Sequence, residues 1–164
     1  MGIFDRFKKS DHIPTSGATK QLTAEDLFEQ GKAYQALSPD KAFQCYLQAA
    51  EMGYAIAMGQ VGICYLHQGH GVECSTEKAA YWFEKGANAG NARCMTLISA
   101  FYMAGVAREQ NDDIARDWLQ KAIETGDENA IATANKRLND YEMQKITWNA
   151  ILNGAEEMGG IPPK

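Results

Sequence analysis

The sequence predicts an all-α fold, an α-solenoid of three helix-turn-helix repeats followed by a C-terminal capping helix. The first observation is a repeat, because similar segments end in Gly53, Gly90 and Gly126, at intervals of 37 and 36 residues. The second is composition, since 164 residues include only 4 prolines and are 45% hydrophobic, which suits amphipathic helices in one packed domain. One helix pair cannot bury both of its apolar faces, so the pairs are expected to stack.

The chain is expected to divide into a leader, a repeat domain and a tail. Residues 1–22 are predicted to be a flexible leader with turn-forming residues, and residues 154–164 a flexible tail rich in glycine and proline. The repeat domain is expected over 23–153. Its three repeats and its end helix are expected at about 24–53, 54–90, 91–126 and 127–153.

The first repeat carries its own start signals. Thr23 followed by Asp26 resembles a capping box, which predicts a helix over about 24–36. Ser38 as N-cap and Pro39 at the first helical position predict that the second helix begins there. The apolar stripe of this second helix is expected to comprise Ala42, Phe43, Tyr46, Leu47 and Ala50.

The later helices show the same kind of signal. Ser75 or Thr76, then Asn111 and Asp127, are expected as N-caps. The fourth and sixth helices are expected to end near the repeat-closing glycines. The third, fifth and last helices are expected over about 54–67, 91–104 and 128–152.

Charge and cysteine content exclude some classes of function. The net charge is −5, and since residues 1–20 carry +2, the remainder carries −7. An acidic body of this kind argues against nucleic-acid binding, which requires a basic face. No stretch reaches the roughly 18 apolar residues of a membrane span, so no stable membrane insertion is expected. The start lacks the apolar run of a secretory signal, and we expect a cytoplasmic protein with reduced thiols.

The middle repeat carries the most detailed pattern, which runs from the third predicted helix into the fourth. Its landmarks are Ala57, Val61-Gly62, Tyr65, Gly69, Gly71-Val72, Lys78-Ala79, Trp82-Phe83, Lys85, Ala87 and Gly90. This pattern resembles the Sel1-like repeat (SLR) family, relatives of the tetratricopeptide (TPR) repeats. The resemblance extends over about residues 24–126 and implies a scaffold for protein complexes. The third repeat departs from the pattern, because Ser99 and Ala107 stand where the family has glycine.

The repeat positions suggest how the core is built. Gly31 and Gly62 are expected to let paired helices approach closely. Tyr65 and Tyr102 are expected to fill the space between helices. Trp82 and Trp118 are expected to bury large areas between neighbouring repeats. We therefore interpret these aromatic residues as core residues and not as cofactor ligands.

No segment has the pattern of an active site. His67, His70, Glu73 and Cys74 include zinc-ligand types, but their spacing matches no zinc signature, and a polar loop is expected. No nucleophile elbow, phosphate loop or dinucleotide-binding turn is present. We therefore expect neither catalysis nor a metal or other cofactor.

Secreted members of the resembled family provide the alternative function. Those members are disulfide-bonded and were described as penicillin-binding, which implies a small hydrolase. Cys45, Cys64, Cys74 and Cys94 do not recur at one repeat position, and Cys45 and Cys94 are expected to be small buried residues. The hydrolase remains an alternative, as does a toxin-neutralising binding partner.

The preferred function is binding of a protein or peptide in a concave groove formed by the first helix of each pair. On the third helix, the side opposite the core is expected to present Ile56, Gln60, Ile63 and His67. The corresponding positions elsewhere are Arg93, Leu97 and Ala100 on the fifth helix, and Glu25, Glu29 and Lys32 on the first. Apolar Ile63 and Leu97 on such a face indicate an interaction patch, unless the end helix or the leader covers them.

The end helix offers a second candidate surface. It carries more apolar residues than one capping face needs, which are Leu138, Tyr141, Met143, Ile146, Trp148, Ile151 and Leu152. Self-association through this helix is the alternative to simple packing on the third repeat. The partner itself is not specified by the sequence.

Overall fold

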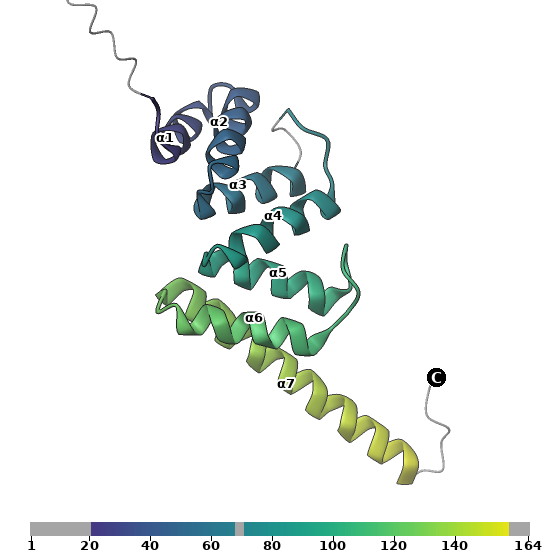
Figure 1. The fold of residues 1–164 in the computed structure, drawn as a ribbon. Coiled ribbons are helices and arrows are strands. Elements are labelled where there is room, and N and C mark those ends of the chain that lie inside the picture. The colour runs from purple at the N-terminus through teal and green to yellow at the C-terminus, as the bar shows by residue number, and fades with distance from the viewer. Residues whose placement is uncertain (1–20, 68–70, 158–164) are drawn as a thin grey trace, which may run out of the picture.

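The computed structural model describes residues 21–67 and 71–157, and within the last helix it leaves out the side chains of Trp148 and of residues 151–157. The expected flexible leader and tail lie largely outside this range. The described residues form helices and no strand (Figure 1). The helices are α1 (Ala24–Tyr34), α2 (Pro39–Glu51), α3 (Ala55–Leu66), α4 (Thr76–Asn88), α5 (Ala92–Ala104), α6 (Asp112–Glu124) and α7 (Glu128–Glu157).

The helices stack in chain order. α1 packs on α2, α3 on α4, and α5 on α6, and each pair contacts the next through α2–α3 and α4–α5. The seventh helix packs on both helices of the third pair, and its C-terminal half extends beyond the stack (Figure 1). The expected all-α solenoid with a terminal capping helix is therefore confirmed.

The repeat-closing glycines end helices as expected. Gly53, Gly90 and Gly126 have φ angles of 93°, 87° and 79°, which is the left-handed region that glycine enters without a steric penalty. Asn111 caps α6 and Asp127 caps α7. Each side chain accepts a hydrogen bond from the backbone amide three residues later, at 2.9 Å and 2.7 Å. Each turn is thus fixed by its own local sequence.

Two helix ends and one cap differ from the expected ones. α1 ends at Tyr34 rather than near residue 36, because the amides of Leu37 and Ser38 turn back onto the Tyr34 carbonyl. Ser38 occupies the N-cap position of α2, but its side chain makes no capping hydrogen bond. α7 continues through Gly154 to Glu157 instead of ending near residue 152, since one glycine inside a helix costs only about 1 kcal/mol.

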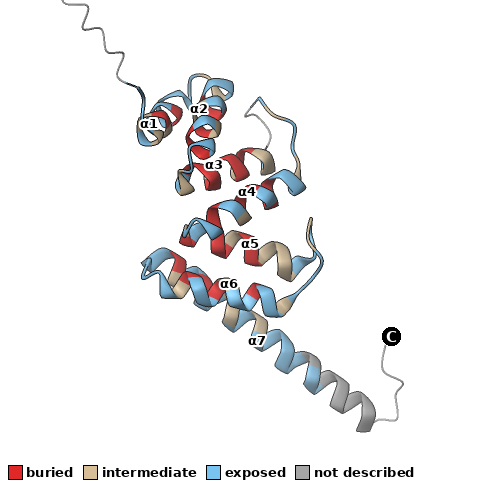
Figure 2. Cartoon of the chain, viewed as in Figure 1, coloured by how far each residue is buried: buried red, intermediate tan, exposed pale blue. Residues whose placement is uncertain are grey.

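The core consists of two adjoining clusters rather than one cluster per repeat (Figure 2). One cluster joins α1, α2 and α3 with Trp82 of α4. The other joins the rest of α4 with α5, α6 and the first turns of α7. The middle repeat is therefore divided between the two clusters, and Tyr65 packs against both. Burial of α3 and α4 depends on the neighbouring repeats on either side.

A glycine lies under an aromatic ring in each of the first two helix pairs. A Cβ atom on Gly31 would lie 2.5 Å from the Tyr46 ring, and one on Gly62 would lie 2.5 Å from the Phe83 ring. The expected close approach at these glycines is confirmed. In the third pair the equivalent positions hold Ser99 and Leu119, both fully buried. Serine is larger than the glycine it replaces, and leucine is smaller than the aromatic residue it replaces.

Side chains from different repeats also meet directly. Phe43 packs edge-on against Tyr65, with ring centroids 5.6 Å apart. Between the second and third repeats, the Glu84 carboxylate accepts a hydrogen bond from the Tyr102 hydroxyl at 2.9 Å. The same carboxylate forms an ion pair with Arg108 at 2.7 Å. The two tyrosines therefore fill the repeat interfaces as expected, one in an apolar and one in a polar setting.

The two repeat tryptophans are not equivalent. Trp82 is 9% exposed and packs among residues of the first repeat, which confirms its expected place between repeats. Trp118 is only partly buried, with the Lys121 ammonium 4.5 Å from its ring centroid. Trp118 borders a recess that Ala87 and Met95 also line, so part of its ring faces solvent.

Truncation of Trp82 tests the coupling between the first two repeats. We expect Trp82→Ala to lower the free energy of unfolding by about 3–5 kcal/mol, because a large buried side chain is lost. Its neighbour Tyr81 is 51% exposed, so Tyr81→Ala serves as the control with a much smaller loss. Chemical denaturation measures both, and equal losses would contradict the inter-repeat role of Trp82.

Substitution of Gly62 tests the close helix approach. We expect Gly62→Ala to cost about 1–3 kcal/mol, because its Cβ would overlap the Phe83 ring. Adding Phe83→Leu, which copies the third repeat, should recover part of that loss and give a measurable coupling energy in a double-mutant cycle. If the stability losses of the two single variants simply add in the double variant, the Phe83 ring is not what excludes a side chain at position 62.

Ala107 provides a test in the opposite direction. Its φ angle is 55°, whereas its counterpart in the second repeat, Gly71, has a φ angle of 67°. A left-handed conformation costs a non-glycine residue roughly 1–2 kcal/mol, while glycine adds roughly 0.5–1 kcal/mol of unfolded-state entropy. Ala107→Gly should therefore raise the free energy of unfolding by about 1 kcal/mol or less. A clear loss in thermal unfolding would show that the Ala107 methyl contact outweighs the backbone strain.

Candidate functional site

The expected groove face of α3 is a mixed surface. Ile56 is 49% exposed and His67 is also exposed, whereas Gln60 and Ile63 are partly buried. Ile56 stands in the first turn of the helix and His67 directly follows its last residue. These residues therefore offer a partner one apolar side chain near the start of α3 and a polar one at its end.

The matching face of α5 is more shielded than expected. Arg93 is exposed, but Leu97 and Ala100 are partly buried. Leu97 and Ile63 both pack against the core cluster of the second and third repeats. The two residues were expected to mark an open apolar patch, and the structure instead leaves each with only part of its surface facing solvent. The reason is that both side chains are partly covered by the core cluster against which they pack.

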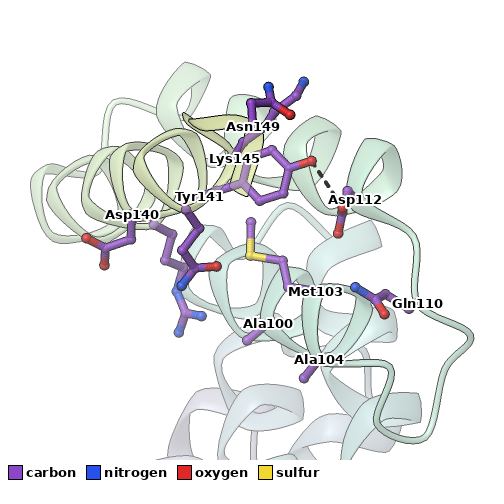
Figure 3. Close-up of a pocket in the computed structure, with 11 residues that line it drawn as sticks. Ala100, Met103, Ala104, Gln110, Asp112, Asp140, Tyr141, Lys145 and Asn149 are labelled. Carbon is purple, nitrogen blue, oxygen red and sulfur yellow. Dashed lines mark hydrogen bonds between the residues drawn. The ribbon is translucent and has the colours of Figure 1, made fainter. Parts of the chain in front are cut away.

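A pocket with a volume of about 680 Å³ lies where α7 leaves the stack (Figure 3). α5, the segment leading into α6, and α7 all contribute to it. Its lining residues are Ala100, Met103, Ala104, Gln110, Asp112, Arg137, Asp140, Tyr141, Gln144, Lys145 and Asn149. Sequence reasoning had singled out only Ala100 and Tyr141 as candidate surface residues. The others have no shared motif, although the unusual length of the last helix signalled that it leaves the stack.

Contacts between α6 and α7 fix one wall of this pocket. The Tyr141 hydroxyl donates a hydrogen bond to the Asp112 carboxylate at 3.0 Å, and this hydrogen bond raises the pKa of the Tyr141 hydroxyl. Arg116 lies 5.8 Å from the Tyr141 ring centroid and 3.6 Å from the Glu142 carboxylate. α7 is therefore anchored to α6 at the point where it leaves the stack.

A second, smaller pocket lies between α5 and the start of α7. Its volume is about 230 Å³, and its lining residues are Arg93, Thr96, Asp127, Asn129, Ala130 and Thr133. The expected site residue Arg93 thus lies at one end of the α5–α7 boundary. Ala100 and Ala104 lie at the other end, in the larger pocket. The two pockets therefore lie toward opposite ends of the α5–α7 boundary.

The far half of α7 carries exposed apolar side chains. Met143 is 62% exposed and Ile146 is 60% exposed, whereas Leu138 and Tyr141 are partly buried against the stack. Of the other apolar residues named in this helix, Trp148, Ile151 and Leu152 have side chains outside the described residues. The helix therefore divides into a half that caps the stack and a half that extends from it.

The cysteines and the histidine-containing loop show no arrangement for catalysis among the described residues. Burial raises the pKa of the Cys64 thiol to about 11 and that of Cys94 to about 12, which disfavours the reactive thiolate. Cys94 is buried as expected, but Cys45 is partly exposed.

The described residues contain no cluster of three or more metal-ligand side chains, and His70 lies outside them. Within the same residues, no helix has the length and apolar character to cross a bilayer.

Comparison with known proteins places the fold. A curated relative, chitin synthase regulatory factor 3 of Schizosaccharomyces pombe, is 27% identical over 99 residues, which are 58% of this chain and 11% of that protein. A Sel1 repeat protein from Oxalobacter formigenes superposes with a TM-score of 0.62 at 26% identity, covering 66% of this chain and 45% of its own. The cysteine-rich protein B of Helicobacter pylori superposes with a TM-score of 0.57 at 20% identity, covering 66% and 87%.

The chain spans less than half the length of the first two of these proteins. The family model for the Sel1 repeat matches residues 24–54, 55–91 and 92–127, which is more than half of the chain. Those bounds follow the three helix pairs of the structure. Sel1 repeats mediate protein–protein interaction, and their fold is typically a non-catalytic scaffold. The chain therefore belongs to the Sel1 repeat family, within the TPR-like superfamily.

Proposed function

We propose that this protein is a non-catalytic adaptor that binds a protein or peptide segment along the first helices of its repeats. The observation that carries the proposal is the position of Ala100. This residue continues the expected groove face of α5 and also lines the 680 Å³ pocket beside α7. A segment lying on Ile56, Arg93 and Leu97 would therefore meet a recess at one end rather than a uniformly convex surface.

Other observations support binding rather than catalysis. The groove presents a mixture of apolar and polar side chains, as protein interfaces do. One relative is named a regulatory factor of chitin synthase, a name that describes regulation of an enzyme rather than catalysis. We place the adaptor in the cytoplasm as part of the same proposal, because its cysteines occupy unrelated repeat positions and suit a reducing compartment.

The proposal predicts that exposed residues of the groove face decide partner capture. We expect the Ile56→Glu, Arg93→Glu variant to lose a specific partner in affinity capture from a native lysate, read by mass spectrometry. Both side chains are exposed, so circular dichroism should show an unchanged fold. Ile56→Glu removes an apolar contact from the second repeat, and Arg93→Glu reverses a charge in the third.

The control for this test is Leu37→Glu. Leu37 is an exposed apolar residue in the turn between α1 and α2, away from the groove face. The control should capture the same proteins as the wild type. Capture of an identical set by the groove variant would contradict the proposed function and direct attention to the far half of α7.

A further inference from the structure

The pocket at the end of the groove has the size and floor of a peptide-binding site. Its volume of about 680 Å³ falls within the range of roughly 300–1,000 Å³ that ligand sites occupy. Ala100, Met103 and Ala104 of α5 supply an apolar surface (Figure 3). Several residues of an extended chain would fit there, with an aliphatic side chain against Met103.

Two cations in the pocket have no partner among the described residues. Arg137 and Lys145 both line the pocket, and neither makes an ion pair or hydrogen bond with another residue of the described part of the chain. Arg108 and Arg116, by contrast, are paired with Glu84 and Glu142. The pocket cations are therefore available to an external group.

The carboxylates of the pocket do not neutralise these cations. Asp112 accepts the hydrogen bond from Tyr141 at 3.0 Å, and it is the first residue of α6, where the helix dipole favours a negative charge. Asp140 also lines the pocket, but it forms no ion pair with another described residue. The side-chain amides of Gln110, Gln144 and Asn149 add further hydrogen-bond donors.

The groove has a matching polarity. Its α1 end carries Glu25 and Glu29, of which Glu29 is paired with Lys32 at 2.8 Å. Its α5 end carries Arg93, which forms no ion pair with another described residue. A bound segment would therefore place its acidic part toward α5 and α7, the two helices that also contribute to the pocket.

We propose that this pocket binds a short acidic and apolar segment of the protein partner. An Asp or Glu side chain of that segment accepts hydrogen bonds from Arg137 and Lys145, and an adjacent aliphatic or aromatic side chain rests on Ala100 and Met103. Arginine suits this task because its guanidinium can bind a carboxylate through two parallel hydrogen bonds. The inference rests on the proposed adaptor function and names the chemistry of its ligand.

A selection from random octapeptides displayed on phage tests the inference with the full chain. We expect the enriched peptides to carry Asp or Glu next to Leu, Ile, Met or Phe. A synthetic, fluorescein-labelled version of the best peptide should bind at least about tenfold more weakly to the Arg137→Gln, Lys145→Gln variant, because charge-assisted hydrogen bonds are lost. Fluorescence anisotropy measures both affinities.

The control variant is Lys136→Gln, Lys41→Gln, which removes the same total charge outside the pocket lining. It should bind the peptide as the wild type does. Equal weakening in both double variants, enrichment of neutral or basic peptides, or no enrichment would each overturn the inference. Failure of the two proposals is distinguishable, because a partner that depends on Ile56 and Arg93 but not on Arg137 and Lys145 would leave the adaptor function standing.

Discussion

The close contact between the two helices of each pair, at a small residue facing a larger side chain, sets the geometry on which the rest of the structure depends. Gly31 and Gly62 leave room for the rings of Tyr46 and Phe83, and these rings are almost fully buried. A helix pair closed in this way packs on the next pair through the α2–α3 and α4–α5 contacts, and stacking buries apolar surface on both pairs. The first helices line up as a consequence, which is the origin of the candidate groove.

Most of the fold could be predicted from the sequence because it is specified locally and repeatedly. Periodic apolar positions, N-caps such as Asn111 and Asp127, and the closing glycines each act within a few residues. The boundaries that were missed depend on less local effects. The end of α1 depends on how the chain enters Pro39, which disfavours a helical residue before it, and the length of α7 depends on the absence of a strong stop signal.

The candidate site was predicted only in part, since it does not follow the repeat. Helical spacing correctly predicted that Ile56 and Arg93 are exposed, but it overestimated the exposure of Ile63 and Leu97. Spacing within one helix does not account for the core cluster against which these two side chains pack. The pocket was missed as a unit. Its walls come from α5, the loop before α6, and the non-repeating half of α7, and no periodic pattern links such segments.

The end of the stack and the pocket have a common cause in α7. Its first turns repeat the first helix of a pair, because Ala130 and Ala134 are buried at the positions of Cys94 and Ile98. At the next repeat position, however, Gly62 and Ser99 give way to Asn135, which is exposed. A polar side chain leaves no space there for the ring of a further second helix, and among the described residues only α5 and α6 pack on α7. Without such a partner, α7 continues past α5 and is held by Tyr141 on Asp112, and the recess between them is the pocket.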